Sequence, residues 1–454
     1  MGISRFVVIL GCALAAGACT SIVEIRTEHS AVPVKSLGDT RLEECVTGHR
    51  SPNEIVNSLE DYGDFLIGYV EFDDQGWLYP NKAKGQPDQI QALVQRMRGD
   101  LAKYGDSNLV TLVFIHGWHH NAHDNDCNVN EFRGMVERTY DVFAHQRPDG
   151  KDWRVVGVYV GWRGEAVDVP VLKYSTILDR RYAAEHVAKG SVRELFAELR
   201  QLELEQSGPG DRRVRTIIVG HSFGGLIVFN ALSQAVVNEL VSTKPRPLPT
   251  SGSDIKCEPL KGAGPPLWPD QMVLINPAFE ASRFEALHHA ARLDNGCRYL
   301  PERPRLLSVT ADNDWATGSA YTAFRWVGTL FEGYNDMASK AEDDVERDAN
   351  HHTVGFVKRY QTHRLSLRTD GQQSYVESKF APAAGTGIEV DPNTPLWVLR
   401  APPEIVDGHD GFLYSRHEGK LIPKPYLLDW LLCVYLWNGD AARSEKCQLE
   451  EAGR

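Results

Sequence analysis

One short stretch near the middle of the chain constrains its fold more than any other. The apolar, β-branched run at 216–219 leads into Gly-x-Ser-x-Gly at 220–224, and a helix-forming run follows. This pattern is typical of a strand that turns sharply into a helix, with glycines where the two backbones pass too close for a Cβ atom. We therefore expect Ser222 to lie at the apex of the turn, in a strained backbone conformation, with its hydroxyl open to a neighbouring base.

A second apolar segment, about a hundred residues earlier, strengthens this interpretation. Residues 110–115 predict a buried strand that ends in His116-Gly117. With these two motifs in this order, the chain resembles the α/β-hydrolase superfamily, on its esterase and lipase side, over residues 60–440. The resemblance implies a nucleophilic role for Ser222 and an oxyanion-binding loop after His116.

Apolar strands alternate with helical segments along most of the chain. The predicted strands cover 65–72, 110–115, 153–160, 216–219, 272–278, 305–310 and 396–400, and the predicted helices cover 90–101, 131–143, 192–205 and 427–437. This alternation predicts an α/β fold with a mostly parallel central β-sheet and helices on both faces. The α/β-hydrolase resemblance implies the same architecture.

The expected domain organisation is simple. A polar tether or N-terminal arm at 19–60 precedes one hydrolase domain at 61–454. Within that domain a long excursion at about 315–392 follows the strand that should carry the catalytic acid. In α/β-hydrolases such excursions cover the active site as a lid, and the alternative is a packed peripheral element.

The N-terminus reads as an export signal. One basic residue precedes a short apolar run at 6–18 that is too short to span a bilayer, and Cys19 follows it. Ala-Gly-Ala-Cys at 16–19 resembles a bacterial lipobox, although Ala16 stands where leucine is commonest. The resemblance implies a signal peptide at 1–18, lipidation of Cys19 and an exported lipoprotein of the outer membrane or facing the periplasm. Ordinary signal cleavage is the alternative, and Cys12 is a poorer lipidation candidate.

Export implies an oxidising compartment, in which six further cysteines can form three disulfides. A Cys257–Cys297 bond would staple the Pro- and Gly-rich segment at 243–269, whereas Cys433 lies in an apolar helical run and could be a buried thiol. The formal net charge of −12, without a Lys/Arg cluster, argues against nucleic-acid binding. The expected partners are an ester substrate and, through the lipid anchor, a membrane.

The resemblance also implies an acid and a histidine after the serine, in that chain order. The acid should follow the strand at 305–310, where Asp314 and Asp312 compete; we favour Asp314, and the other aspartate then caps the turn. The histidine should lie between the last strand and the last helix, where His409 stands in a Gly-His-Asp-Gly loop. The rival histidines are His351, His352, His363 and His417.

An oxyanion needs two preorganised N–H donors. The backbone N–H groups of Phe223 and Trp118 are the expected pair. The loop at 116–126 also invites a zinc hypothesis, but its spacing matches no common zinc motif, and no His-Glu-x-x-His is present in the chain. We therefore expect neither a metal nor a cofactor, although the loop contains His119, His120, His123 and Asp124.

The sequence thus predicts a serine hydrolase that cleaves carboxylic esters or lipids. Ser222 would attack the ester carbonyl, His409 would act as base, Asp314 would orient His409, and water would hydrolyse the acyl-enzyme. Two alternatives remain open. One is a non-catalytic envelope protein that keeps the fold to bind a partner, and the other is a metal-dependent hydrolase that uses the 116–126 histidines.

Overall fold

The computed structural model describes most of the chain between residues 23 and 436. The described residues are 23–34, 54–147, 150–164, 176–208, 211–247, 257–258, 268–292, 297, 304–328, 340–371, 373–383, 390–417 and 420–436. The predicted signal peptide and the lipidation site Cys19 lie outside them.

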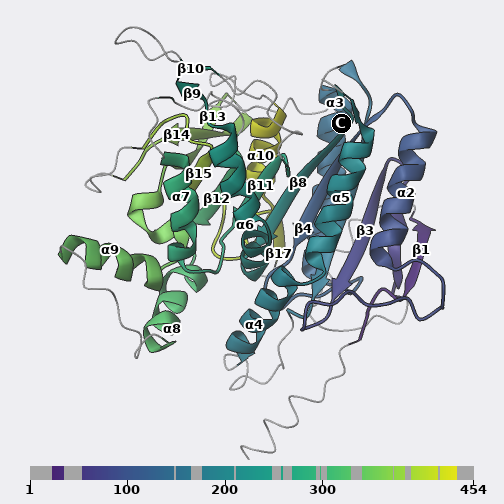
Figure 1. Ribbon diagram of the computed structural model, residues 1–454, viewed down its shortest axis with the longest axis horizontal. Helices are drawn as coiled ribbons and strands as arrows, with labels where there is room; N and C mark the ends of the chain where they lie inside the picture. The colour runs from purple at the N-terminus through teal and green to yellow at the C-terminus, as the bar shows by residue number, and fades with distance from the viewer. Residues whose placement is uncertain are drawn as a thin grey trace, which may run out of the picture.

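A mixed 11-stranded sheet runs through the described part of the protein (Figure 1). Its order is β1-β2-β3-β5-β4-β8-β11-β12-β15-β13-β14. Every neighbouring pair from β3 to β13 is parallel, and the pairs β2–β3 and β13–β14 are antiparallel. The strands are β1 (Glu28–Pro33), β2 (Asn57–Asp61), β3 (Phe65–Phe72), β4 (Asn108–Ile115), β5 (Trp153–Trp162), β8 (Val214–His221), β11 (Gln271–Ile275), β12 (Leu306–Ala311), β13 (His363–Asp370), β14 (Gln373–Phe380) and β15 (Leu396–Ala401).

Helices cover both faces of this sheet. One face packs against α2 (Gln89–Lys103), α4 (Thr176–Lys189), α5 (Val192–Gln206), α6 (Phe223–Thr243) and α7 (Glu285–Arg292). The other face packs against α3 (Cys127–Gln146) and α10 (Tyr426–Leu436). The central strands are apolar on both sides, as a sheet buried between two helix layers requires. The predicted α/β class is therefore confirmed.

The remaining elements are short. They are the strand pairs β6 (Ser207–Gly208) with β7 (Asp211–Arg212), β9 (Arg246–Pro247) with β10 (Cys257–Glu258), and β16 (Tyr414–His417) with β17 (Lys420–Pro423); the helices α8 (Tyr321–Gly328) and α9 (Lys340–His351); and single helical turns at Ala281–Phe284, Ala316–Ala320, Val354–Phe356 and Lys358–Tyr360.

Two segments in which the sequence predicted no strands extend the sheet at its edges. β1 and β2 lie within the predicted tether at 19–60, so the described part of this segment is an arm built into the fold. Glu60 of β2 is fully buried and binds two arginines, Arg26 and Arg133, which ties the arm to α3. At the far edge, β13 pairs with β15 and then turns back through β14, so this part of the excursion is a packed peripheral element.

The long helix α6 follows the turn at Ser222. It is the one described helix with the length and composition to cross a membrane, but half of its apolar window is buried inside the protein. Its first turn approaches the carboxyl end of β4 so closely that a Cβ atom on Gly224 would lie 2.0 Å from the carbonyl oxygen of Ile115. Glycine at 224 is therefore required for α6 to reach this position beside the sheet.

A disulfide joins Cys257 to Cys297, the pair considered from the sequence. Cys127 and Cys433 are also disulfide-bonded, so the interpretation of Cys433 as a buried thiol is wrong. The apolar helical run around Cys433 concealed this role, because it explains a buried sulfur atom without a partner.

We predict that Gly224→Ala destabilises the protein by about 1–3 kcal/mol, since the added methyl group must displace the carbonyl of Ile115. Gly99→Ala is the matched control. Gly99 is exposed in α2 with open space around its Cα, so alanine there should stabilise the helix by up to about 1 kcal/mol. Urea unfolding of both variants tests the prediction, and equal stabilities would contradict it.

Candidate functional site

The candidate site lies at the carboxyl edge of the parallel strands. Ser222 follows β8, adopts φ 55° and ψ −119°, and is 4% exposed. A positive φ is strained for serine, and two hydrogen bonds hold it there. The N–H of Ser222 donates to the carbonyl of Ile275 at 3.0 Å, and its own carbonyl accepts from the N–H of Ala278 at 3.1 Å. The neighbouring strand β11 and the loop that follows it therefore fix the sharp turn.

A hydrogen-bonded chain runs from this serine to a buried carboxylate. The hydroxyl of Ser222 lies 2.8 Å from Nε2 of His409, in the loop after β15. Nδ1 of His409 lies 3.1 Å from each carboxylate oxygen of Asp314, which follows β12. Asp314 also accepts hydrogen bonds from the N–H groups of Ala316 and Thr317 and from the hydroxyl of Thr317. The structure thus brings together Ser222, His409 and Asp314 from three separate parts of the chain.

The pKa shifts of His409 and Asp314 agree with the hydrogen bonds between these two side chains. Burial on its own lowers the pKa of His409, but the hydrogen bond and charge of Asp314 outweigh burial, and the pKa of His409 is raised above its ordinary value. Burial raises the pKa of Asp314, but the hydrogen bond with His409 and its bonds from Thr317 bring that pKa below its ordinary value. Asp314 is therefore a carboxylate at neutral pH, and it favours the protonated form of His409.

Asn276 holds the histidine loop against the sheet. This residue follows β11, is fully buried and adopts a positive φ of 45°. Its side-chain amide donates to the carbonyls of Gly408 (3.0 Å) and His409 (2.7 Å), and its Oδ1 accepts from the N–H of Ala311 (2.9 Å). One side chain therefore links the end of the acid-bearing strand to the loop that carries the imidazole.

His221 supports the same loop from the other side. Its Nε2 donates to the carbonyl of His409 at 2.9 Å, while its Nδ1 has no hydrogen-bond partner among the described residues. Burial lowers its pKa to about 4, so the ring is neutral. The ligand atoms of His221, His409 and Asp410 lie within 4.8 Å of one another, but both imidazoles are engaged in the hydrogen bonds described above.

The loop after β4 passes directly over the serine. A Cβ atom on Gly117 would lie 2.9 Å from Cβ of Ser222, so a larger residue would clash there. The fully buried ring of His116 braces this loop: Nδ1 donates to the carbonyl of Gly117 at 2.8 Å, and Nε2 accepts from the N–H of Trp162 at 3.1 Å. Burial lowers the pKa of His116 to about 4, so it is a neutral structural residue.

Two backbone N–H groups near Ser222 have no acceptor within the described residues. They belong to Trp118, directly after Gly117, and to Phe223, the first residue of α6. The next N–H along the loop, that of His119, is already donated to the carbonyl of Gly164. The N–H groups of Trp118 and Phe223 thus have no protein acceptor in the described part of the chain.

The alternative acid Asp312 and the candidate metal ligands of the 116–126 loop have other partners than His409 and Ser222. Asp312 forms ion pairs with Arg364 and Arg400 and does not reach His409. In the 116–126 loop, His120 binds Asp126 and His123 binds Glu54, so these two imidazoles point to different carboxylates and not to a common centre. The same loop's Asp124 is paired with Arg133, and His119 stacks on Trp118.

The rival histidines are also separate from Ser222. His351, the last residue of α9, and His352, which follows it, each donate a hydrogen bond from Nδ1 to a backbone carbonyl of α9. His363 begins β13, where its ring stacks on Trp397. His417 lies in the short strand β16. None of His351, His352 and His363 is hydrogen-bonded to Ser222 or Asp314 within the described part of the structure.

Sequence reasoning missed Asn276 and Thr317 as residues of the site. A polar residue directly before proline, at the end of an apolar strand, was the available signal for Asn276. Thr317 gave no signal, because its contact with Asp314 arises from the single helical turn that follows the acid.

Comparison with known proteins gives one family. A family model described as "Alpha/beta hydrolase family" matches residues 112–356, which is more than half of the chain. This range includes Ser222 and Asp314, and His409 lies beyond it. No curated protein matches the chain.

Two solved structures show weaker similarity. One is phospholipase PlaB from Legionella pneumophila in complex with thio-NAD, with 14% identity and a TM-score of 0.24; the alignment covers 62% of this chain and 51% of that one. The other is an uncharacterized protein from Pseudomonas aeruginosa, with 12% identity, a TM-score of 0.18 and coverage of 54% and 42%. The chain therefore aligns with about half of each structure.

We predict that the pKa of His409 depends on Asp314. In Asp314→Asn the charge that raises this pKa is lost while the ring stays buried, so the pKa of His409 should fall below its value in the wild type. Asp312→Asn is the control, because Asp312 has other partners. Titration of the imidazole signals by NMR measures both. A shift in the Asp312 variant with none in the Asp314 variant would contradict the assignment.

Proposed function

The chain belongs to the α/β-hydrolase family, and we propose that it is a serine hydrolase that cleaves carboxylic esters, including lipid esters. The observation that carries the proposal is the hydrogen-bonded series Ser222–His409–Asp314 at the carboxyl edge of the sheet. Two unpaired N–H groups beside the serine support it. A protein that used this fold only to bind a partner would not need all of these groups aligned.

The residues of the series have distinct roles in the proposed reaction. As the hydroxyl of Ser222 attacks the ester carbonyl carbon, its proton passes to Nε2 of His409 across the 2.8 Å contact. Asp314 keeps the proton on Nδ1 and stabilises the imidazolium that forms. His409 then donates the proton to the leaving alcohol, which leaves an acyl group on Ser222. Water, deprotonated by His409, attacks the acyl-enzyme and releases the carboxylic acid.

The tetrahedral intermediate places a negative charge on the former carbonyl oxygen. In the proposed site the N–H groups of Trp118 and Phe223 bind this oxygen, and the positive end of α6 adds to the stabilisation because Phe223 is its first residue. Both donors follow residues that are held in place before substrate binds. Trp118 follows Gly117, whose carbonyl accepts a hydrogen bond from His116, and Phe223 follows Ser222, whose N–H donates to Ile275 at the end of β11. One such donor contributes roughly 10²–10³-fold to the rate in enzymes of this kind.

The proposal places this reaction in the cell envelope. The lipobox-like sequence at 16–19 supports an exported protein held at the membrane through a lipid on Cys19. An enzyme anchored in this way meets lipid esters directly, which favours lipids or other membrane-associated esters as substrates.

We predict that a fluorophosphonate probe labels the wild-type protein and that labelling is lost in Ser222→Ala and in His409→Ala. The first variant lacks the attacking oxygen, and the second lacks the base that activates it. His352→Ala is the matched control for the histidine change, since His352 directly follows α9 and its side chain is 34% exposed. Gel fluorescence after a fixed labelling time measures the effect.

Two outcomes would reject the proposal. A folded wild-type protein that is not labelled would favour a binding function. Ester hydrolysis that survives Ser222→Ala and is abolished by a chelator would favour the metal-dependent alternative.

We also predict the pH dependence of ester hydrolysis. Because the pKa of His409 is raised above 6.5, the neutral form needed as base is lost as the pH falls through a value above 6.5. The value of kcat/KM should therefore decline on the acid side with an apparent pKa above 6.5. A profile that stays flat down to pH 5 would contradict His409 as base.

A further inference from the structure

A pocket lies at the opposite edge of the sheet from Ser222. Leu396, the first residue of β15, and Thr362, which precedes β13, form part of its lining. Asp314 and His409 follow the other ends of the parallel strands β12 and β15. The six residues of β15 span roughly 20 Å, so the pocket is separate from the candidate active site.

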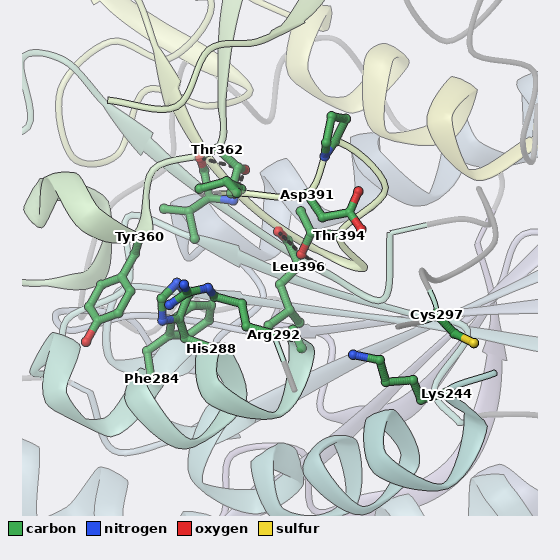
Figure 2. Close-up of a pocket in the computed structure, with 14 residues that line it drawn as sticks. Lys244, Phe284, His288, Arg292, Cys297, Tyr360, Thr362, Asp391, Thr394 and Leu396 are labelled. Atoms are coloured by element: carbon green, nitrogen blue, oxygen red, sulfur yellow. Dashed lines mark hydrogen bonds between the residues drawn. The ribbon is translucent and has the colours of Figure 1, made fainter. Parts of the chain in front are cut away.

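One side of this pocket carries basic groups (Figure 2). His288 and Arg292 are one turn apart on α7, and Lys244 follows the end of α6. No hydrogen bond or ion pair of the Arg292 guanidinium is found within the described part of the chain. Arg292 is exposed, so its guanidinium donors are open to solvent and to a ligand that enters the pocket.

His288 adds a second polar group without a partner. Its residue is 8% exposed, and its Nδ1 has no hydrogen-bond partner among the described residues. Burial lowers its pKa to about 4, with the positive charge of Arg292 acting in the same direction, so the ring is neutral. Buried polar atoms are usually satisfied by protein, water or a ligand. The buried, unpaired imidazole nitrogen of His288 in the lining of this cavity is therefore a feature of a binding site.

The remaining walls are mostly apolar. Phe284, Leu396 and Val398 are 1–3% exposed in the whole protein and line the cavity together with Tyr360. One acidic residue, Asp391, lies on the far side of the pocket from Tyr360, and its carboxylate accepts the N–H of Asn393. The lining thus holds two basic side chains, Arg292 and Lys244, and one acidic side chain, Asp391.

We propose that this pocket binds a small molecule in which one carboxylate or phosphate group is joined to a short apolar part. Arg292 and Lys244 bind the anionic group, since a guanidinium matches the two oxygens of a carboxylate or phosphate. The apolar part packs on Phe284, Leu396 and Val398. The cavity volume of 280 Å³ lies just below the roughly 300–1,000 Å³ of common ligand pockets, so the volume limit is a small molecule of about one ring.

The test is calorimetric titration of the protein with phenyl phosphate, benzoate and inorganic phosphate. Phenyl phosphate and benzoate each fit the volume limit and combine an anion with an apolar ring, whereas inorganic phosphate has only the anion. We expect at least one of the two aromatic anions to bind at least tenfold more tightly than inorganic phosphate. A preference between these two would identify phosphate or carboxylate as the natural group.

Substitutions at and away from Arg292 test whether the aromatic anion binds in this pocket. Arg292→Gln should weaken the aromatic anion at least tenfold, and Arg292→Lys, which keeps the charge, should weaken it less. Arg368→Gln on the exposed hairpin β13–β14 is the matched control and should bind as the wild type does. Ser222→Ala should also bind normally, which separates this pocket from the candidate active site. Thermal unfolding of each variant checks that it is folded.

The proposal is overturned by either of two results. One is the absence of binding of both aromatic anions to the wild type at millimolar concentration. The other is an unchanged affinity in folded Arg292→Gln, which would place the anion elsewhere on the protein.

Discussion

The close contact between the carboxyl end of β4 and the first turn of α6 is the constraint on which the rest of the site depends. Gly224 lets α6 begin against the carbonyl of Ile115, and Gly117 lets the loop after β4 pass over Ser222. Between these two glycines Ser222 is forced to a positive φ, and its hydroxyl points toward the histidine loop. A side chain at either glycine would move the serine away from its base and from the N–H groups around it.

The strain at Ser222 is balanced by a network that reaches across four strands. β11 and the residues just after it bind the backbone of Ser222 on both sides, and Asn276, which follows β11, continues this support to β12 and to the loop of His409. Asp314 is held by Thr317 and by its own turn before it meets His409. The series is therefore preorganised by backbone contacts, which is what fast acyl transfer requires of a rigid site.

The sequence predicted the parts of this structure that local patterns encode. The strand–turn–helix at 216–229 and the alternation of apolar strands with helices predicted the α/β class, which is confirmed, and the family match supports the resemblance drawn from the same motifs. Chain order within the family predicted where to look for Asp314 and His409, and the structure brings both to Ser222. The edge strand β1 was missed because Glu28–Pro33 is polar and short, and β13 was missed because polar and charged residues interrupt its few apolar ones, so no apolar run marks either strand. Asn276 and Thr317 act through contacts that only the folded chain creates.

The central claim is that Ser222 carries the acyl group during the reaction, and rapid-mixing kinetics with a 4-nitrophenyl ester test it most directly. The account predicts a burst of nitrophenol close to one equivalent of enzyme when deacylation is slow, together with an intact-protein mass increased by one acyl group that maps to the peptide containing Ser222. Turnover of the ester with no acylated protein at any time, and with undiminished rate in Ser222→Ala, would contradict it.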